Sequence, residues 1–273
     1  MIPFVKTHAL GNDFLLAQID DVPADYPETA RRMCHRYFGI GADGLILWKR
    51  EADRFRLRIF NQDGSEAECS GNGLRCAAAY LMERCVYDKP EIQLETVSGL
   101  YTLRRLGDLY EADMGIPALS PQDIPFNPAA PIDRVVNYPI QLETEMVSIT
   151  ACSTGNPHCS LFVERPDENE VRRIGPLLEH HAAFPNRTNV EFIHVRNDHE
   201  IDVAFWERGV GLTYASGTGS CGATVACILN GKTGRKVTVY SKAGKLKVEW
   251  PENGHLRLTA TANVVAEGRY LEL

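Results

Sequence analysis

A serine–glycine motif occurs twice in this chain of 273 residues, once in each half. Ser70-Gly71-Asn72-Gly73 recurs 146 residues later as Ser216-Gly217-Thr218-Gly219. Gly11-Asn12-Asp13-Phe14 recurs 144 residues later as Gly155-Asn156-Pro157-His158. Matches in the same order at nearly one offset indicate an internal duplication. The chain is therefore expected to fold as two similar halves.

The residues before and after these motifs predict the same elements in both halves. Residues 55–60 and 201–205 alternate between apolar and polar side chains, as half-buried strands do, and lead to Phe60-Asn61 and Trp206-Glu207. Each serine–glycine motif is followed by a short run of small and apolar residues, which predicts a helix. The expectation is an α+β fold of two pseudo-symmetric halves, each with many strands and a central short helix.

Two further helices and a strand-rich tail are predicted outside the repeats. Pro27-Glu28 predicts a helix that runs to Phe38 and ends at Gly39. A second helix is expected from Glu170 to His181, with an interruption at Gly175-Pro176. Residues 236–273 are expected to form several short strands.

The boundary between the halves is predicted from proline content. Five of the 15 prolines lie between Pro117 and Pro131, a density typical of a linker without regular structure. This places the first half at residues 1–117 and starts the second at residue 118.

Composition and charge exclude several classes of function. The net charge is −7, with 29 basic and 36 acidic residues, which argues against a nucleic-acid partner. No apolar run reaches the ~18 residues that a spanning helix needs, and the first residues lack a signal-peptide pattern. The eight cysteines include no C-x-x-C pair, so reduced thiols are expected rather than a zinc site or disulfides. We expect a cytoplasmic protein with no membrane contact and no metal.

Each serine–glycine motif has two explanations. The start of a helix presents unpaired N–H groups and a partial positive charge, so the two motifs could bind carboxylates. If the halves pack about a pseudo-twofold axis, both helix starts would face one interdomain cleft, and Ser70 and Ser216 would reach the ligand from opposite sides. Alternatively, each serine only caps its helix, which is its commonest role there.

A third glycine-rich segment predicts only a turn. Gly39-Ile40-Gly41-Ala42-Asp43-Gly44 matches G-x-G-x-x-G, but a predicted helix precedes it and a predicted strand follows. The dinucleotide fingerprint needs the reverse order, so a nicotinamide site is not expected. Pyridoxal phosphate is not expected either, because neither repeated motif contains a lysine for its Schiff base.

At this level of detail the chain resembles the diaminopimelate epimerase family, over nearly its whole length and in the family's motif order. The segments that carry the resemblance are Gly11-Asn12-Asp13-Phe14, Phe60-Asn61-Gln62-Asp63-Gly64-Ser65, Gly71-Asn72-Gly73-Leu74-Arg75-Cys76, Gly155-Asn156-Pro157-His158-Cys159, Asn189-Val190-Glu191-Phe192, Glu207-Arg208-Gly209 and Gly217-Thr218-Gly219.

The resemblance implies a cofactor-independent isomerase that interconverts LL- and meso-diaminopimelate on the route to lysine and cell-wall precursors. It implies two pseudo-symmetric halves, each a strongly curved, mostly antiparallel sheet around a central helix. The second half would end at residue 261, and the tail 262–273 would return to the first. His158 and Glu207 would lie near the reacting groups. The residues implied to bind substrate are Asn12, Asn61, Gly71, Asn72, Asn156, Asn189, Glu207, Arg208, Gly217 and Thr218.

The chain departs from the family at the two positions where the chemistry occurs. The family's mechanism uses two cysteines, one per half, directly before the first glycine of each motif, and these positions hold Ser70 and Ser216. Cys69 is one residue away, but the spacing from Asn61 is that of the family, and neighbouring side chains of an extended segment point to opposite sides. We interpret Cys69 and Cys221 as packing residues.

Three hypotheses follow for the activity. The first is an epimerase in which Ser70 and Ser216 exchange protons with the help of His158 and Glu207. The second is a relative that isomerises or dehydrates another amino acid, and the third is a silent binder of diaminopimelate. We adopt the first because the implied binding residues are retained. A homodimer is also implied, although Ala266 stands where the family's dimer segment carries an aromatic residue.

Overall fold

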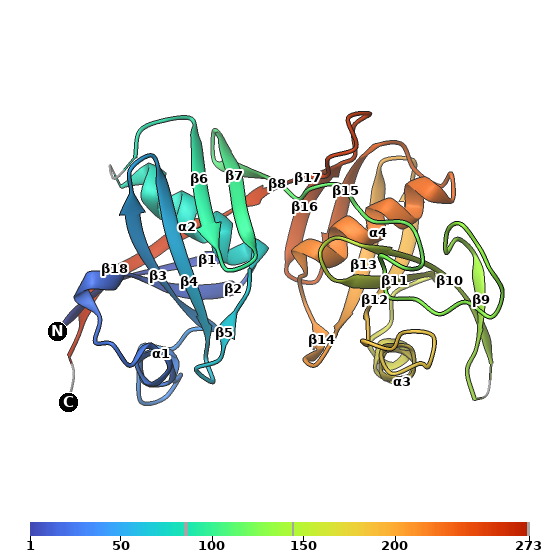
Figure 1. Ribbon diagram of the computed structural model, residues 1–273, viewed down its shortest axis with the longest axis horizontal. Coiled ribbons are helices and arrows are strands. Elements are labelled where there is room, and N and C mark those ends of the chain that lie inside the picture. The colour runs from blue at the N-terminus through green and yellow to red at the C-terminus, as the bar shows by residue number, and fades with distance from the viewer. Residues whose placement is uncertain (85–86, 144, 272–273) are drawn as a thin grey trace. The chain divides into compact units, whose positions relative to one another are not determined.

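The computed structural model describes residues 1–84, 87–143 and 145–271, which divide into two compact units (Figure 1). Unit 1 comprises Met1–Asp113 and Thr259–Leu273, and unit 2 comprises Met114–Leu258. The first boundary thus lies a few residues before the expected position at 117, and the second a few residues before 261. Within the described part of the chain, no helix is long and apolar enough to cross a bilayer.

Unit 1 is a curved sheet around one buried helix. The helix α2 (Gly71–Glu83) contains alanine, leucine and methionine, which favour helix, and nine of its residues are buried. It contacts strands β1, β2, β6, β7, β8 and β18, so the sheet curls around it (Figure 1). The elements of unit 1 are β1 (Ile2–Ala9), β2 (Asn12–Gln18), η1 (Ile19–Asp21), α1 (Tyr26–Cys34), β3 (Gly44–Glu51), β4 (Arg54–Asn61), β5 (Glu66–Ala67), α2, β6 (Glu91–Thr96), β7 (Gly99–Leu106), β8 (Leu109–Asp113) and β18 (Asn263–Tyr270).

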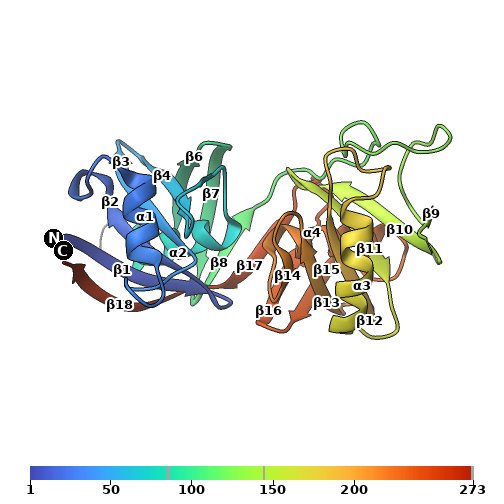
Figure 2. The ribbon, with the colours of Figure 1, turned by 90° about the horizontal axis from the view of Figure 1, so that it is seen from below.

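The C-terminal strand completes the sheet of unit 1. β18 pairs antiparallel with β1, and the two strands lie side by side in Figure 2. β17 (Arg257–Thr261) spans the boundary and pairs with β8. The tail of the chain therefore belongs to the first unit, as the resemblance implied.

Unit 2 repeats this design. Its helix α4 (Gly217–Leu229) also has nine buried residues and contacts six surrounding strands. Its other elements are β9 (Tyr138–Gln141), β10 (Met146–Ser153), β11 (Pro157–Phe162), α3 (Glu168–Glu179), β12 (Asn189–Asn197), β13 (Glu200–Glu207), β14 (Gly211–Thr213), β15 (Lys236–Ser241) and β16 (Gly244–Glu249).

The strand pairings are the same in both units. β1, β2, β3 and β4 pair in sequence as antiparallel, parallel and antiparallel, and so do β10, β11, β12 and β13. β4 then pairs antiparallel with β5 and parallel with β6, as β13 does with β14 and β15. The expectation of two pseudo-symmetric α+β halves is confirmed.

Each sheet has a helix on both faces. In unit 1, Leu15, Leu45 and Leu47 pack in one apolar cluster with Ala30 and Met33 of α1. Because side chains alternate along a strand, the intervening residues face α2. α3 takes the place of α1 in unit 2.

Two of the predicted helices differ from the structure. α1 ends at Cys34 rather than Phe38, because the chain turns back there. The N–H groups of Ile40 and Ala42 bond to the carbonyls of Met33 and Cys34 and so complete the end of the helix. The segment after it, the predicted G-x-G-x-x-G turn, is indeed irregular up to Asp43.

The predicted interruption of the second helix is absent from α3. The helix runs without a break through Pro176, although proline removes a backbone donor. Val171, Ile174 and Leu178 bury one face of this helix in the core of unit 2. This packing outweighs the lost hydrogen bond.

The proline-rich segment is not a free linker. Residues 117–131 lack regular strands and helices, as expected, but Ile124 and Phe126 are buried in the core of unit 2. The Phe126 ring packs against Tyr138 and Phe184, with centroids 5.2 and 5.0 Å away. Apolar residues among the prolines were the signal that this segment packs.

Candidate active site

The serine of each repeated motif caps the helix that follows it. Ser70 has φ −142° and ψ 115°, and its Oγ accepts the N–H of Gly73 at 3.1 Å. Ser216 has φ −142° and ψ 125°, and its Oγ accepts the N–H of Gly219 at 3.2 Å. A Cβ on Gly219 would lie 2.9 Å from the Ser216 Oγ, so a side chain there would disturb the cap. The capping explanation is confirmed for both serines.

Capping leaves donors for a ligand at each helix start. The first N–H groups of a helix have no partner within it. In α2 these belong to Gly71 and Asn72, and in α4 to Gly217 and Thr218, and all four residues are partly exposed. Each helix start can therefore donate to a carboxylate.

In unit 1, Asn12 and Asn72 lie together beside the start of α2. The Asn72 amide donates to Asn12 Oδ1 at 3.1 Å, and the Asn12 amide donates to Asp43 Oδ2 at 2.7 Å. Arg75, which is fully buried, donates to Asn72 Oδ1. Asn61 is exposed at the end of β4 and donates to Ser65 Oγ at 2.9 Å. The carboxylate of Asp43 thus orients two residues of the expected binding set.

In unit 2, three buried polar side chains, His158, Ser160 and Glu191, lie together on the face of the sheet next to α4. His158 Nδ1 lies 2.6 Å from Glu191 Oε1, and His158 Nε2 lies 2.9 Å from Asn156 Oδ1. Ser160 donates to the other oxygen of Glu191 at 3.0 Å. A Cβ on Gly222 of α4 would lie 2.8 Å from the His158 ring, so this glycine lets the helix approach. Both ring nitrogens of His158 thus have a polar side chain as partner.

Glu207 lies near the Ser216 cap. Its Oε1 accepts the hydroxyl of Thr213 at 2.8 Å, and the Ser216 side chain lies close enough to lower the pKa of this carboxyl. Burial raises the pKa of Glu207, and the hydrogen bond from Thr213 and the positive charge of His158 offset this only in part. A buried carboxyl with a raised pKa therefore lies beside the Ser216 cap.

Asn189 and Arg208 hold the turn that follows Glu207. Asn189 Oδ1 accepts the backbone N–H of Arg208 at 3.0 Å, and its amide donates to the carbonyl of Pro157 at 2.9 Å. The guanidinium of Arg208 is exposed and donates to the carbonyl of Asn186 at 3.1 Å. Asn189 was expected to bind substrate, whereas here its side chain bonds to the backbone of two neighbouring segments.

Comparison with known proteins identifies the family. The chain matches the diaminopimelate epimerase family over residues 4–118 and 150–266. It is 47% identical over 277 residues to the diaminopimelate epimerase of Pelotomaculum thermopropionicum, and the match covers 98% of each chain. This chain belongs to the diaminopimelate epimerase family. The resemblance inferred from the motifs is confirmed.

Solved structures agree with the fold of a diaminopimelate epimerase family member. A phenazine biosynthesis protein of the PhzF family from Bacillus anthracis superposes with a TM-score of 0.70 at 15% identity, covering 100% of this chain and 99% of that one. A predicted epimerase from Pseudomonas aeruginosa gives 0.68 at 17% identity, with 100% of both chains covered. At such identities the likeness is one of fold.

In this family member, Cys69 lies among polar side chains of unit 1. Its thiol interacts with Tyr101, Ser98 and Thr96 on the β6–β7 side of unit 1. Burial raises the pKa of the Cys69 thiol, and hydrogen bonds from Tyr101 and Ser98 offset it only partly. A reactive thiol needs the opposite shift, so these surroundings support its interpretation as a packing residue.

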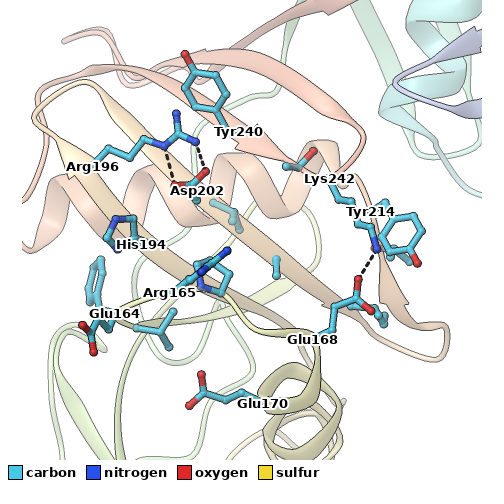
Figure 3. Close-up of a pocket in the computed structure, with 18 residues that line it drawn as sticks. Glu164, Arg165, Glu168, Glu170, His194, Arg196, Asp202, Tyr214, Tyr240 and Lys242 are labelled. Carbon is cyan, nitrogen blue, oxygen red and sulfur yellow. Dashed lines mark hydrogen bonds and ion pairs between the residues drawn. The ribbon is translucent and has the colours of Figure 1, made fainter.

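A groove of about 1130 Å³ also lies on unit 2, and none of the expected site residues lines it. Figure 3 shows that several of its charged side chains pair with one another: Arg196 bonds to Asp202 through two nitrogens, and Lys242 bonds to Glu168. Thr213, the hydrogen-bond partner of Glu207, is one of its lining residues.

Three residues that bond to the expected site residues were not predicted from the sequence. Glu191, Asp43 and Thr213 each bond to a residue of the expected set. A signal existed for Glu191, because a charged residue occupies a position that strand alternation buries against a helix. Thr213 and Asp43 gave no such signal, since their partners are distant in sequence or separated by a turn.

Proposed function

We propose that the protein binds diaminopimelate and interconverts its LL and meso forms without a cofactor, with serine hydroxyls at the two positions where the family uses thiols. The observation that carries this proposal is the matched pair of serine-capped helix starts, each next to retained residues of the family's motifs. One helix start would bind the carboxylate at the reacting carbon and stabilise the charge that develops when the α-proton leaves.

The proposed proton transfer gives the two serines different tasks. Ser216 Oγ takes the α-proton while its own proton passes to Glu207. The hydroxyl of Ser70 donates its proton to the opposite face of the α-carbon. Glu207 then loses a proton to water and Ser70 regains one, so that protons balance over the cycle; the reverse reaction runs the same steps backwards.

The hydroxyl pair is expected to work slowly. A serine is a weak base until a neighbouring group activates it. Ser216 has Glu207 as such a group, whereas the equivalent position in unit 1 is the amide Asn61. This difference favours a second candidate, a protein that binds diaminopimelate and exchanges the α-proton on one side only or not at all.

Proton NMR in D₂O with LL-diaminopimelate tests the proposal. Loss of the α-hydrogen signal together with formation of the meso isomer is the expected result. The Ser70→Cys/Ser216→Cys variant is the matched control, because it restores the family's thiol pair, and we expect it to react about 10²–10⁴ times faster. Binding without exchange in the wild type would support the second candidate. A keto-acid product would indicate a dehydratase, and no binding at all would contradict the substrate.

The location of the protein and its oligomeric state are also proposed. We propose that the protein acts in the cytoplasm, and that it forms a homodimer through residues 264–268 of β18. Val265 in this segment is 56% exposed, and the small side chain of Ala266 leaves room for a strand of a second copy. Light scattering at micromolar concentration should give twice the 30.4 kDa of the chain. A single-chain mass would contradict the dimer.

A further inference from the structure

A buried carboxylate at the end of α3 lies where helix electrostatics disfavours it. Glu179 is the last residue of α3, and only 3% of it is exposed. The C-terminal end of a helix carries partial negative charge, so a carboxylate there is repelled, and burial adds a desolvation cost. Such a residue persists when donors compensate for both effects.

The donors that compensate Glu179 come from both sides of Glu207 and Arg208. The indole N–H of Trp206 donates to Glu179 Oε2 at 2.7 Å, and the backbone N–H of Gly209 donates to Glu179 Oε1 at 2.9 Å. The two expected site residues lie between these donors in the sequence. Arg187 and His180 also face the carboxylate, with nitrogen–oxygen distances of 3.6 and 3.9 Å.

The packing of α3 is adapted to the same contact. A Cβ on Gly175 would lie 2.6 Å from Cγ of Trp206, so only glycine allows the indole to lie against the helix. The ring is therefore fixed by packing on one side and by Glu179 at its nitrogen. On the far side of the turn, Gly209 has φ +77°, a conformation that glycine adopts without strain.

We infer that Glu179 is a positioning residue: its carboxylate bonds to Trp206 and Gly209 and so fixes Glu207 and Arg208 in the orientation that substrate needs. The inference rests on the proposed roles of these two residues. Unit 1 uses a different group at the equivalent place, where Arg31 of α1 donates to the carbonyl of Asp63, in the turn after Asn61. Both units thus fix this turn from the preceding helix, but only unit 2 does so with a buried charge.

The titration of Glu207 tests the inference without any substrate. Carboxyl ¹³C NMR of the full chain should show that Glu179→Gln lowers the pKa of Glu207 toward its ordinary value, because a released turn lets water reach that carboxylate. Trp206→Phe removes one donor but keeps a ring on Gly175, and it should shift the titration in the same direction. Glu170→Gln removes a charge from the first turn of the same helix and should leave the titration of Glu207 unchanged.

Calorimetric binding of diaminopimelate is the second measurement. We expect Glu179→Gln to weaken binding about tenfold, the size expected when one hydrogen bond to a charged group is lost. An unchanged Glu207 titration in both Glu179→Gln and Trp206→Phe would overturn the inference. A different outcome is that the two variants shift the Glu207 titration while the wild-type protein fails to bind diaminopimelate. That result would contradict the proposed function and leave the positioning role of Glu179 supported.

Discussion

The two units share a backbone but differ in the side chains next to their central helices. In unit 1, the face of β2 and β3 toward α2 carries Phe14, Leu16 and Ile46, all buried. The positions that correspond to them in unit 2 carry His158, Ser160 and Glu191, which are equally buried and joined by hydrogen bonds.

The same contrast continues at the end of the next strand. β4 ends on Asn61, which cannot titrate, and β13 ends on Glu207, whose carboxylate contacts the Ser216 cap. The two units therefore share the backbone that places the helix starts, while the acid–base side chains at these positions lie in unit 2. In the proposed mechanism, with hydroxyls in both caps, this difference makes unit 2 the half that accepts the proton.

Removing the acid–base difference between the units should have the largest effect, and it should act on the rate of α-proton exchange. We expect Glu207→Gln to lower the rate of α-proton exchange about 10²–10⁴-fold, since general base catalysis contributes that much. Asn61→Asp, the opposite change in unit 1, should raise the exchange rate or leave it unchanged. NMR exchange in D₂O measures both. Equal losses in Glu207→Gln and Asn61→Ala would contradict a special role for unit 2.

The pH dependence of exchange follows from the direction of the Glu207 shift. Burial raises the pKa of Glu207, so its basic form, which accepts the proton from Ser216, is lost as pH falls through this raised value. Exchange should therefore decline at a pH above the ordinary glutamate value of about 4.3, and Glu207→Gln should remove this step. The free energy of unfolding depends on pH with the opposite sign. Because the folded state holds this proton more tightly than the unfolded state, Glu207 stabilises the fold fully at low pH, and this contribution is lost as pH rises through the raised pKa.

The secondary structure and the repeat could be predicted from the sequence better than the long-range side-chain contacts. The repeat, the alternation in 55–60 and 201–205 and the positions of both serine caps depend on local patterns, and all of these appear in the structure. The predicted end of α1 was wrong because Gly39 was taken as the helix stop, whereas the chain already turns back after Cys34 and bonds to the last carbonyls of the helix. The partners of Glu179 and Glu191 could not be assigned in advance, because Trp206, Gly209 and His158 are distant in the sequence and only folding brings them together.

Exchanging the buried groups between the units should give the next largest effect. We expect Glu191→Ile alone to destabilise unit 2 by about 1–3 kcal/mol for each group left unpaired, because His158 and Ser160 stay buried without the carboxylate that they hydrogen-bond. The triple variant His158→Phe/Ser160→Leu/Glu191→Ile copies unit 1 and should be less destabilised than the single variant, since it leaves no unpaired charge. Urea denaturation measures both. A triple variant less stable than Glu191→Ile would show that the apolar set of unit 1 does not fit unit 2.

Removing either serine cap should have the smallest effect, a loss of stability that is nearly equal in the two units. Ser70→Ala and Ser216→Ala each remove one hydrogen bond to the third N–H of a helix, which costs about 1 kcal/mol of stability. Because the two caps have almost the same backbone angles and bond lengths, the losses should agree within about 0.5 kcal/mol. Ser216 also interacts with Glu207, so a clearly larger loss for Ser216→Ala would mean that this contact contributes to folding as well as to proton transfer. Denaturation curves of the two single variants and the double variant would separate these cases, since caps in different units should act additively.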